Sequence, residues 1–306
     1  MSNQLEVEVA GLKLPNPTML AAGILGLTGA SLRETVDKGA GAVVTKSIGV
    51  NPRSGYANPS VVHVNCGLLN AIGLPNPGSK DFAEEIRDLK KDGLNVPVIA
   101  SVFGFSADEF AKSANLLAVA GADAIELNVS CPHVEKTGSE IGQSPALVDE
   151  VVRKVRKTVE KPVIVKLTPN VADIAEVAKA AVNAGADAVT AINTVRAMAI
   201  DIETAQPILA NKVGGLSGSA IKPVAVRCVY EIYDVVDVPI LGCGGVTNWR
   251  DAVELMLAGA SAVQIGTAIA SEGLGVFKSI TKGVELYLRK KGFRSVKEIV
   301  GLSHCR

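Results

Sequence analysis

A short glycine-alanine junction recurs four times along the chain, and it limits the fold more than any other feature. Gly-Ala-x-Ala begins at Gly39, Gly121, Gly185 and Gly259, and each copy follows a helical stretch and precedes an apolar run. Glycine just past the last helical turn is a typical C-cap, and the small residues after it let a helix and a strand pack closely. The repeat therefore predicts a chain built from helix-to-strand units.

Proline junctions alternate with the glycine junctions. Pro97, Pro162 and Pro239 each stand immediately before a short apolar run. Because proline disfavours helix in the residue before it, each marks the end of a helix and the start of a strand. Together the two kinds of junction predict seven strands, and an apolar run at the front supplies an eighth. The strands are expected near residues 18–22, 42–47, 97–102, 124–130, 162–168, 188–194, 239–243 and 262–267.

Helical periodicity fills the intervals between these strands, for example at 80–91, 107–120, 146–159, 174–184 and 252–257. Alternating strands and helices are typical of an α/β protein with a parallel sheet, and eight units predict a closed (β/α)8 TIM barrel. The 306 residues fit one such barrel, so we expect a single domain over residues 1–306. An open doubly wound sheet is the alternative.

Two segments depart from a bare barrel. Residues 5–14 alternate between apolar and polar side chains around Gly11, which predicts an N-terminal β-hairpin that covers the barrel floor. Residues 49–79 follow the second strand, are rich in Asn, Pro and Gly, and show no helical period. Loops of this length are usually functional or disordered, so we expect a lid or substrate loop at the catalytic end of the barrel.

Composition narrows the class of protein. The chain is 48% hydrophobic, which allows a large core, and its 31 basic and 31 acidic residues cancel. A zero net charge argues against a nucleic-acid partner, since such proteins carry a bulk basic field. The N-terminus carries Glu6 and Glu8 where a signal peptide needs basic and then apolar residues, and no apolar run is long enough to span a membrane. We therefore expect no export and no membrane association.

The five cysteines form neither a disulfide framework nor a metal site by their spacing. They stand apart from one another, at Cys66, Cys131, Cys228, Cys243 and Cys305. Scattered free thiols are typical of the reducing cytoplasm, and with only three histidines we expect no metal site.

Polar residues stand where several predicted strands end. These residues are Lys46, Asn128, Lys166, Asn193 and Thr194. The carboxyl ends of barrel strands meet at the catalytic mouth, so we expect these side chains to converge there, although a single polar strand end can simply be solvated. Cys131 follows the fourth strand, where a thiol can serve as a base or nucleophile or be an inert core residue.

Glycine-rich turns follow the last strands. Gly242-Cys-Gly-Gly and Gln264-Ile-Gly-Thr both precede helices, and residues 214–218 add a third glycine-rich segment. Glycine lets backbone N–H groups approach phosphate oxygens at a helix N-terminus, and the last two barrel loops are the usual phosphate site. The ligand is therefore expected to carry a phosphate, unless the glycines serve only tight turns.

Seven motifs taken together resemble the dihydroorotate dehydrogenase family over nearly the whole chain. They are Lys46-Ser47, Asn70-Ala-Ile-Gly-Leu-Pro-Asn-Pro-Gly78, Asn128-Val-Ser-Cys-Pro132, Lys166-Leu-Thr-Pro, Ile192-Asn-Thr, Gly242-x-Gly-Gly and Ile265-Gly-Thr. The second motif resembles the class 1B catalytic subunit. Two positions depart from the family pattern, with Ala22 in place of a common Ser and Ser101 in place of a common Asn.

The resemblance implies an FMN-binding site across the barrel mouth. The implied cofactor-binding residues are Ala22, Lys46, Ser47, Asn128, Lys166, Ile192, Gly218, Gly244, Gly245, Gly266 and Thr267. The phosphate would be held by Gly244, Gly245, Gly266 and Thr267, with Gly218 closing one side. Lys166 would lie near the pyrimidine edge of the flavin, where a cation favours the anionic reduced form.

The resemblance also implies the substrate, the reaction and the base. (S)-Dihydroorotate would be oxidised to orotate in pyrimidine biosynthesis, with hydride passing from C6 to FMN N5 and Cys131 removing the C5 proton. Lys46 would pair with the substrate carboxylate. The other implied substrate-binding residues are Asn70, Ala71, Ile72, Gly73, Leu74, Asn128, Asn193 and Thr194.

Class 1B further implies an electron-transfer partner. FAD, a [2Fe-2S] cluster and NAD would be bound by that partner subunit rather than by this chain, in a heterotetramer of two catalytic and two electron-transfer chains around a homodimer core. Three rival functions stay open at this stage: an FMN-dependent dihydropyrimidine dehydrogenase subunit, a tRNA-dihydrouridine synthase, and a Schiff-base aldolase using Lys166 on a sugar phosphate. A phosphate-binding barrel without catalysis is the simplest alternative.

Overall fold

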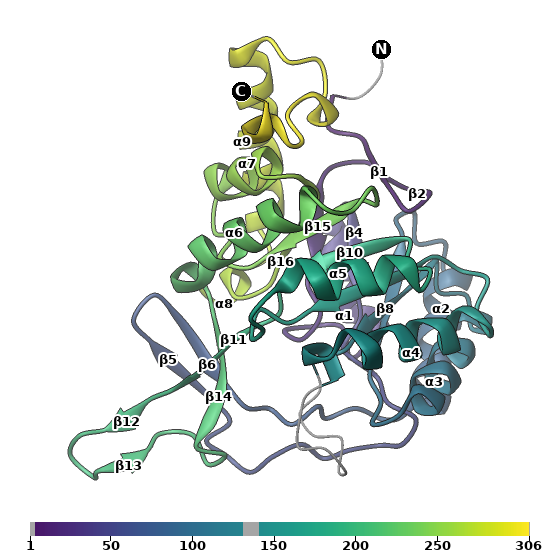
Figure 1. The fold of residues 1–306 in the computed structure, drawn as a ribbon, viewed down its shortest axis with the longest axis vertical. Coiled ribbons are helices and arrows are strands. Elements are labelled where there is room, and N and C mark those ends of the chain that lie inside the picture. Colours follow the sequence, from purple (N-terminus) through teal and green to yellow (C-terminus); the bar gives the residue numbers. More distant parts are fainter. Residues whose placement is uncertain (1–3, 131–140, 306) are drawn as a thin grey trace.

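Eight parallel strands close into a barrel at the centre of the protein (Figure 1). The structure, a computed structural model, describes residues 4–130 and 141–305. The predicted barrel is confirmed, and each predicted strand coincides with an observed one to within a few residues. In barrel order the strands are β3 (Thr18–Leu20), β4 (Ala42–Val44), β7 (Val98–Val102), β8 (Ala124–Asn128), β9 (Val163–Leu167), β10 (Ala188–Ala191), β15 (Ile240–Cys243) and β16 (Ala260–Ile265).

Helices surround the barrel, and their starts follow ordinary capping chemistry. Ser106, Ser144 and Asp173 each accept a hydrogen bond from a backbone N–H of the first turn of the helix that follows. The helices are α1 (Gly29–Asp37), α2 (Ser79–Lys91), α3 (Ala107–Val119), α4 (Pro145–Arg156), α5 (Ile174–Asn183), α6 (Lys222–Tyr233), α7 (Trp249–Leu257), α8 (Ala268–Glu272) and α9 (Val276–Lys291). Short 3-10 turns lie at Ile141–Gln143, Ser219–Ile221, Val296–Glu298 and Leu302–His304.

The glycine-alanine repeat has a structural purpose at the floor of the barrel, the end where the strands begin. Asp123 Oδ2 accepts a hydrogen bond from the N–H of Val98 at 2.7 Å, and Asp187 Oδ2 accepts one from the N–H of Val163 at 2.7 Å. The aspartate of each Gly-Ala-Asp-Ala copy thus satisfies the first N–H of the preceding barrel strand. Buried backbone donors need such partners, so these two copies of the repeat stabilise the starts of β7 and β9.

The N-terminal hairpin is also confirmed. Strand β1 (Val7–Val9) pairs antiparallel with β2 (Leu12–Leu14), and Val9 and Leu14 are buried in the main hydrophobic core. Figure 1 shows this hairpin at the end of the molecule opposite the sheet formed by β5, β6, β11 and β14.

The segment expected to be a loop at 49–79 is partly sheet, which corrects the sequence prediction. It contains a hairpin of β5 (Val61–Val64) and β6 (Gly67–Asn70), which joins β14 (Val213–Ser217) and β11 (Val195–Met198) in the order β11-β14-β6-β5. A smaller ribbon of β12 (Ile200–Asp201) and β13 (Gln206–Pro207) extends from it.

These strands could not be recognised in the sequence because they contain glycine, which is typical of turns. Here glycine instead permits the close approach of two backbone segments. A Cβ on Gly67 would lie 2.0 Å from the carbonyl oxygen of Ser217, and one on Gly214 would lie 2.4 Å from that of Asn70. Residues 214–218, expected as a loop, therefore lie largely in β14. Strands β6 and β14 are far apart in sequence, so no local period predicts their pairing.

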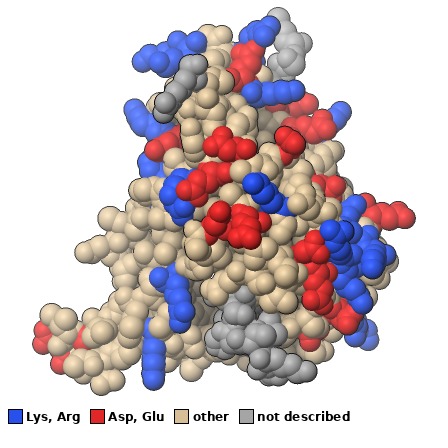
Figure 2. Space-filling model, viewed as in Figure 1, with Lys and Arg blue, Asp and Glu red and all other residues tan. Residues whose placement is uncertain are grey.

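Charges of both signs are mixed on the face of the molecule shown in Figure 2. In Figure 2, Lys and Arg lie beside Asp and Glu on the side that carries α3, and neither sign covers this face. None of the helices in the described part of the chain has the length and hydrophobicity of a transmembrane span.

Candidate active site at the barrel mouth

A cavity of about 860 Å³ lies at the mouth, the carboxyl end of the barrel strands. Its volume is in the range of ligand sites, roughly 300 to 1,000 Å³. Every predicted site residue that the structure describes lines this cavity, whereas Cys131 lies outside the described residues. The lining includes Ala22, Lys46, Ser47, Asn70, Ala71, Ile72, Gly73, Leu74, Asn128, Lys166, Ile192, Asn193, Thr194, Gly218, Gly244, Gly245, Gly266 and Thr267.

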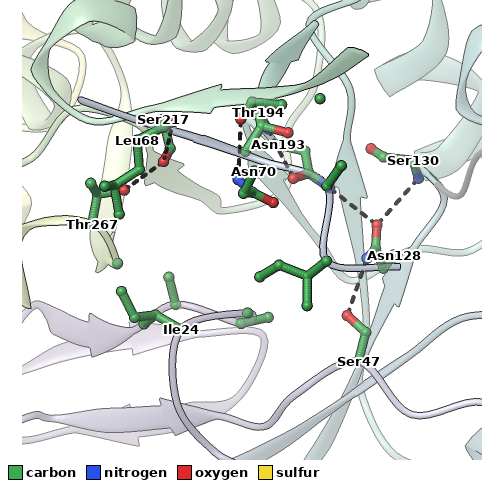
Figure 3. A pocket seen from close by; sticks show the side chains of 18 of the residues that line it. Ile24, Ser47, Leu68, Asn70, Asn128, Ser130, Asn193, Thr194, Ser217 and Thr267 are labelled. Atoms are coloured by element: carbon green, nitrogen blue, oxygen red, sulfur yellow. Dashed lines mark hydrogen bonds between the residues drawn. The ribbon is translucent and has the colours of Figure 1, made fainter. Parts of the chain in front are cut away.

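Three amide side chains and a hydroxyl converge on one side of the cavity. Asn193 Nδ2 donates to Asn128 Oδ1 at 3.1 Å, and Asn128 Nδ2 donates to Ser47 Oγ at 3.1 Å. Asn70 Nδ2 donates to the carbonyl of Gly215 at 3.1 Å. Figure 3 shows Asn128 between Ser47, Asn193 and Ser130, on the side away from Thr267. Amides fixed in this way present both donors and acceptors in set directions.

The opposite side of the cavity offers backbone donors. Within the described residues, the N–H groups of Gly244, Gly245, Gly266 and Thr267 donate no hydrogen bond. Gly244 and Gly245 have φ of +129° and +73°, a region that strongly favours glycine. A Cβ on Gly266 would meet only Ala21 Cβ, at 3.5 Å, so a side chain there would occupy open space in the cavity wall. The turns after β15 and β16 thus form a cradle of unused N–H groups, which suits a phosphate.

The side wall beside this cradle comes from the extra sheet. Thr267 Oγ1 donates to Ser217 Oγ at 2.8 Å, which ties the turn after β16 to the end of β14 (Figure 3). Gly218 has φ of +98°, and a Cβ there would lie 2.6 Å from Gly67 Cα. Glycine at 218 therefore lets β14 and β6 close together against the cradle.

Two lysines lie inside the cavity in different environments. Lys46 Nζ donates to the carbonyl of Gly23 at 2.9 Å, and burial lowers the pKa of Lys46. Lys166 Nζ donates to Gln264 Oε1 at 3.1 Å, so it points into the barrel interior. Burial alone lowers the pKa of Lys166, but Cys243 and Glu126 raise it, and the net shift is upward.

The segment 70–74 is held in place by its neighbours. The N–H of Tyr56 donates to the carbonyl of Ile72 at 3.0 Å, and Arg53 Nε donates to that of Gly73 at 3.4 Å. Gly73 and Leu74 have φ of +78° and +56°, and a Cβ on Gly73 would lie 2.6 Å from the nitrogen of Tyr56. A positive φ at leucine is uncommon and persists only where the surroundings fix it.

Sequence reasoning missed several residues that line the cavity. Arg53, Arg196 and Lys212 add positive charge, and the described lining contains five cationic side chains and no acidic one. The charged side chains of the lining are therefore all cationic although the chain as a whole has zero net charge, and this favours anionic ligands. Asn170 was also missed, although it follows the strand of Lys166, and its Nδ2 donates to the carbonyl of Thr194 at 3.2 Å. Asn170 could have been predicted because it is a polar residue just after a barrel strand. Arg53 and Lys212 do not stand at the end of a predicted barrel strand, so the sequence does not mark them as site residues.

Fold and cavity together define a TIM-barrel protein whose mouth holds a cavity with a cradle of backbone N–H groups and a polar, cationic lining. A profile of the family described as dihydroorotate dehydrogenase matches residues 4–288. The chain belongs to this family.

Curated relatives agree with the family match. The chain is 54% identical to the "Dihydroorotate dehydrogenase B (NAD(+)), catalytic subunit" of Methanosarcina mazei, over 97% of this chain and 94% of the relative. It is 53% identical to the protein of the same name from Pyrococcus abyssi, over 98% of this chain and 99% of the relative. The corresponding protein of Methanothermobacter thermautotrophicus is 52% identical over 98% of both chains.

Proposed function

We propose that this protein oxidises dihydroorotate to orotate in pyrimidine biosynthesis, with FMN as its bound cofactor. Membership of the dihydroorotate dehydrogenase family supports the reaction. The observation that carries the proposal for the site is that one cavity is lined both by the N–H cradle and by Lys46 and three asparagines. It offers a phosphate site and a carboxylate and imide site within one volume.

The residues present fit FMN. The unused N–H groups at Gly244, Gly245, Gly266 and Thr267 would hold its phosphate, and Gly218 would close the side of the cradle. Ala22, Ser47, Ile192 and Lys166 line the same cavity and would surround the ring system. When bound, FMN supplies the acceptor for the hydride that leaves C6 of the substrate.

The other residues would bind and orient the substrate and remove its proton. Lys46 would pair with the carboxylate, and the amides of Asn70, Asn128 and Asn193 would match the imide edge, with residues 71–74 and Thr194 closing around it. We assign Cys131 as the base that takes the C5 proton; it follows Ser130, which lines the cavity.

We further propose an electron-transfer partner that carries FAD and a [2Fe-2S] cluster and reduces NAD. The relatives are named catalytic subunits of an NAD(+) enzyme, which supports a partner subunit. The arrangement we expect is two catalytic and two electron-transfer chains around a catalytic homodimer, in the cytoplasm. Efficient turnover of the isolated chain with fumarate, with no copurifying protein, would contradict this part of the proposal.

The visible spectrum of the purified protein under anaerobic conditions tests the core of the proposal. Flavin bands that bleach on addition of L-dihydroorotate are the expected result. Bands that persist with dihydroorotate but bleach with dihydrouracil would favour a dihydropyrimidine dehydrogenase. A colourless protein that does not take up FMN would instead favour the Schiff-base aldolase. Borohydride trapping at Lys166 would then test that alternative.

A further inference from the structure

A fully buried carboxylate lies inside the barrel, and the proposed function does not use it. Glu126, on β8, has a relative exposure of 0%. Its Oε2 accepts hydrogen bonds from Thr190 Oγ1 at 2.9 Å and from Gln264 Nε2 at 2.7 Å. Its Oε1 has no hydrogen-bond partner among the described residues. A buried charge is costly unless another charge compensates it.

Lys166 is the charge that compensates Glu126. Its Nζ lies 4.0 Å from the unpartnered Oε1, and the two side chains are 5% and 0% exposed. Gln264 bridges the pair, since its Oε1 accepts from Lys166 while its Nε2 donates to Glu126. These opposite roles fix which way the amide of Gln264 points. A cation, an amide and a carboxylate thus form one chain across strands β9, β16 and β8.

We infer that Glu126 is a positioning residue that keeps Lys166 charged and aimed into the cavity, and thereby sets the reduction potential of the bound flavin. The inference rests on the proposed function, because it needs FMN in the cavity that Lys166 lines. A fixed cation in a site with little water stabilises negative charge that develops on a ligand. Without a counter-charge, burial would drive the proton off the lysine.

Two titratable groups of the described chain face Lys166, and one of them carries the charge. Cys243 on β15 and Glu126 on β8 both raise the pKa of Lys166, against the larger opposing effect of burial, and the net shift is upward. Burial raises the pKa of Cys243 itself, so its thiol is neutral at neutral pH. Glu126, whose Oε1 lies 4.0 Å from Lys166 Nζ, is the acidic group to which we assign this role.

The test is an equilibrium redox titration of the FMN-loaded protein against a reference dye, over the neutral and mildly alkaline pH range. Glu126→Gln keeps the shape but removes the charge, so Lys166 loses its proton and the potential falls. We expect at least a tenfold change in the ratio of reduced to oxidised flavin, or about 30 mV for a two-electron couple. Because the lysine then titrates within the range studied, the slope of potential against pH also differs from that of the wild type.

A matched control separates this effect from general loss of a carboxylate. Glu85 on α2 lies outside the barrel, where its Oε2 accepts from the N–H of Gly29. Glu85→Gln should leave the potential and its pH slope unchanged. A potential in Glu126→Gln that equals or exceeds that of the wild type would overturn the inference.

A double variant keeps the inference testable if Glu126→Gln does not hold flavin. Glu126→Gln with Gln264→Glu moves the carboxylate to position 264 on β16, where the side chain already bonds to Lys166. A wild-type potential in this protein supports the inference, and a lower one contradicts it. If the wild type holds no FMN, or its flavin does not bleach with dihydroorotate, the proposed function fails instead.

Discussion

The floor and the mouth of the barrel both place polar side chains at strand ends, but they use them differently. At the floor, Asp123 and Asp187 each accept from a backbone N–H and also pair with a cation, Lys90 or Arg156. These carboxylates are committed to the chain itself. They secure strand starts and leave nothing directed at a ligand.

At the mouth, hydrogen-bonding groups remain in excess. The N–H groups of Gly244 and Gly266 donate no bond within the described residues, and Lys46 uses one of its three donors, on the carbonyl of Gly23. Asn128 and Asn193 bond to each other and so hold one another in place. The comparison teaches that changes at the floor should alter stability alone, whereas changes at the mouth should alter binding and catalysis.

The largest effect we expect comes from the mouth. Cys131→Ala should leave FMN bound but slow its reduction by dihydroorotate by about a hundredfold or more, since a general base contributes about that much. Stopped-flow absorbance under anaerobic conditions measures the rate. Cys305→Ala, which removes an exposed thiol near the C-terminus, is the control and should leave the rate as it is. An undiminished rate in Cys131→Ala would remove this residue from the mechanism.

A floor variant should show the opposite behaviour. Asp187→Ala leaves the buried N–H of Val163 without its acceptor, which costs about 1 to 3 kcal/mol of unfolding free energy. Chemical denaturation measures this loss, and the rate per folded molecule should not change. Asp237→Ala removes an exposed aspartate from the loop before β15 and is the control. It should change neither the unfolding free energy nor the rate per folded molecule. If Asp187→Ala slowed catalysis at unchanged stability, the division between floor and mouth would be wrong.

The cradle can be tested without straining the backbone. Gly266 has no positive φ, and a methyl group there would meet only Ala21 Cβ at 3.5 Å. Gly266→Ala should therefore fold normally yet weaken FMN binding about tenfold, or about 1.4 kcal/mol, by filling the phosphate site. Gly275→Ala, where a Cβ would meet nothing within 4 Å, is the matched control. Fluorescence titration of each apoprotein with FMN measures the dissociation constant. Equal affinities for Gly266→Ala and the wild type would show that Gly266 does not border the phosphate.

The barrel could be predicted from the sequence because its signals are local. Each glycine or proline junction marks one helix-to-strand boundary, and chain direction alone places Lys46, Asn128 and Lys166 at the same end of the sheet. No partner far along the chain has to be known for these steps. The same local rule would have included Asn170.

The extra sheet could not be predicted because it depends on pairing between distant segments. Strands β6 and β14 pair Leu69 with Leu216, and Lys212, which directly precedes β14, lines the cavity. Glu126 escaped notice for another reason. It stands within an apolar strand, and the sequence does not show that its Oε1 lies 4.0 Å from Nζ of Lys166 on the adjacent strand β9.

The smallest effect concerns the protonation of Lys46. Burial lowers its pKa, and only the protonated ammonium can pair with a carboxylate. As pH rises through that lowered pKa, the affinity for orotate should fall, by about twofold at the pKa itself, and the fall should begin below the range of an ordinary lysine near 10.4. Flavin difference spectra measure the dissociation constant at each pH. Titration of orotate itself would appear in both wild type and Lys46→Gln, so the difference between them isolates the lysine. Parallel pH profiles in the two proteins would mean that Lys46 does not hold the carboxylate, and the mouth would then depend on its N–H groups and amides instead.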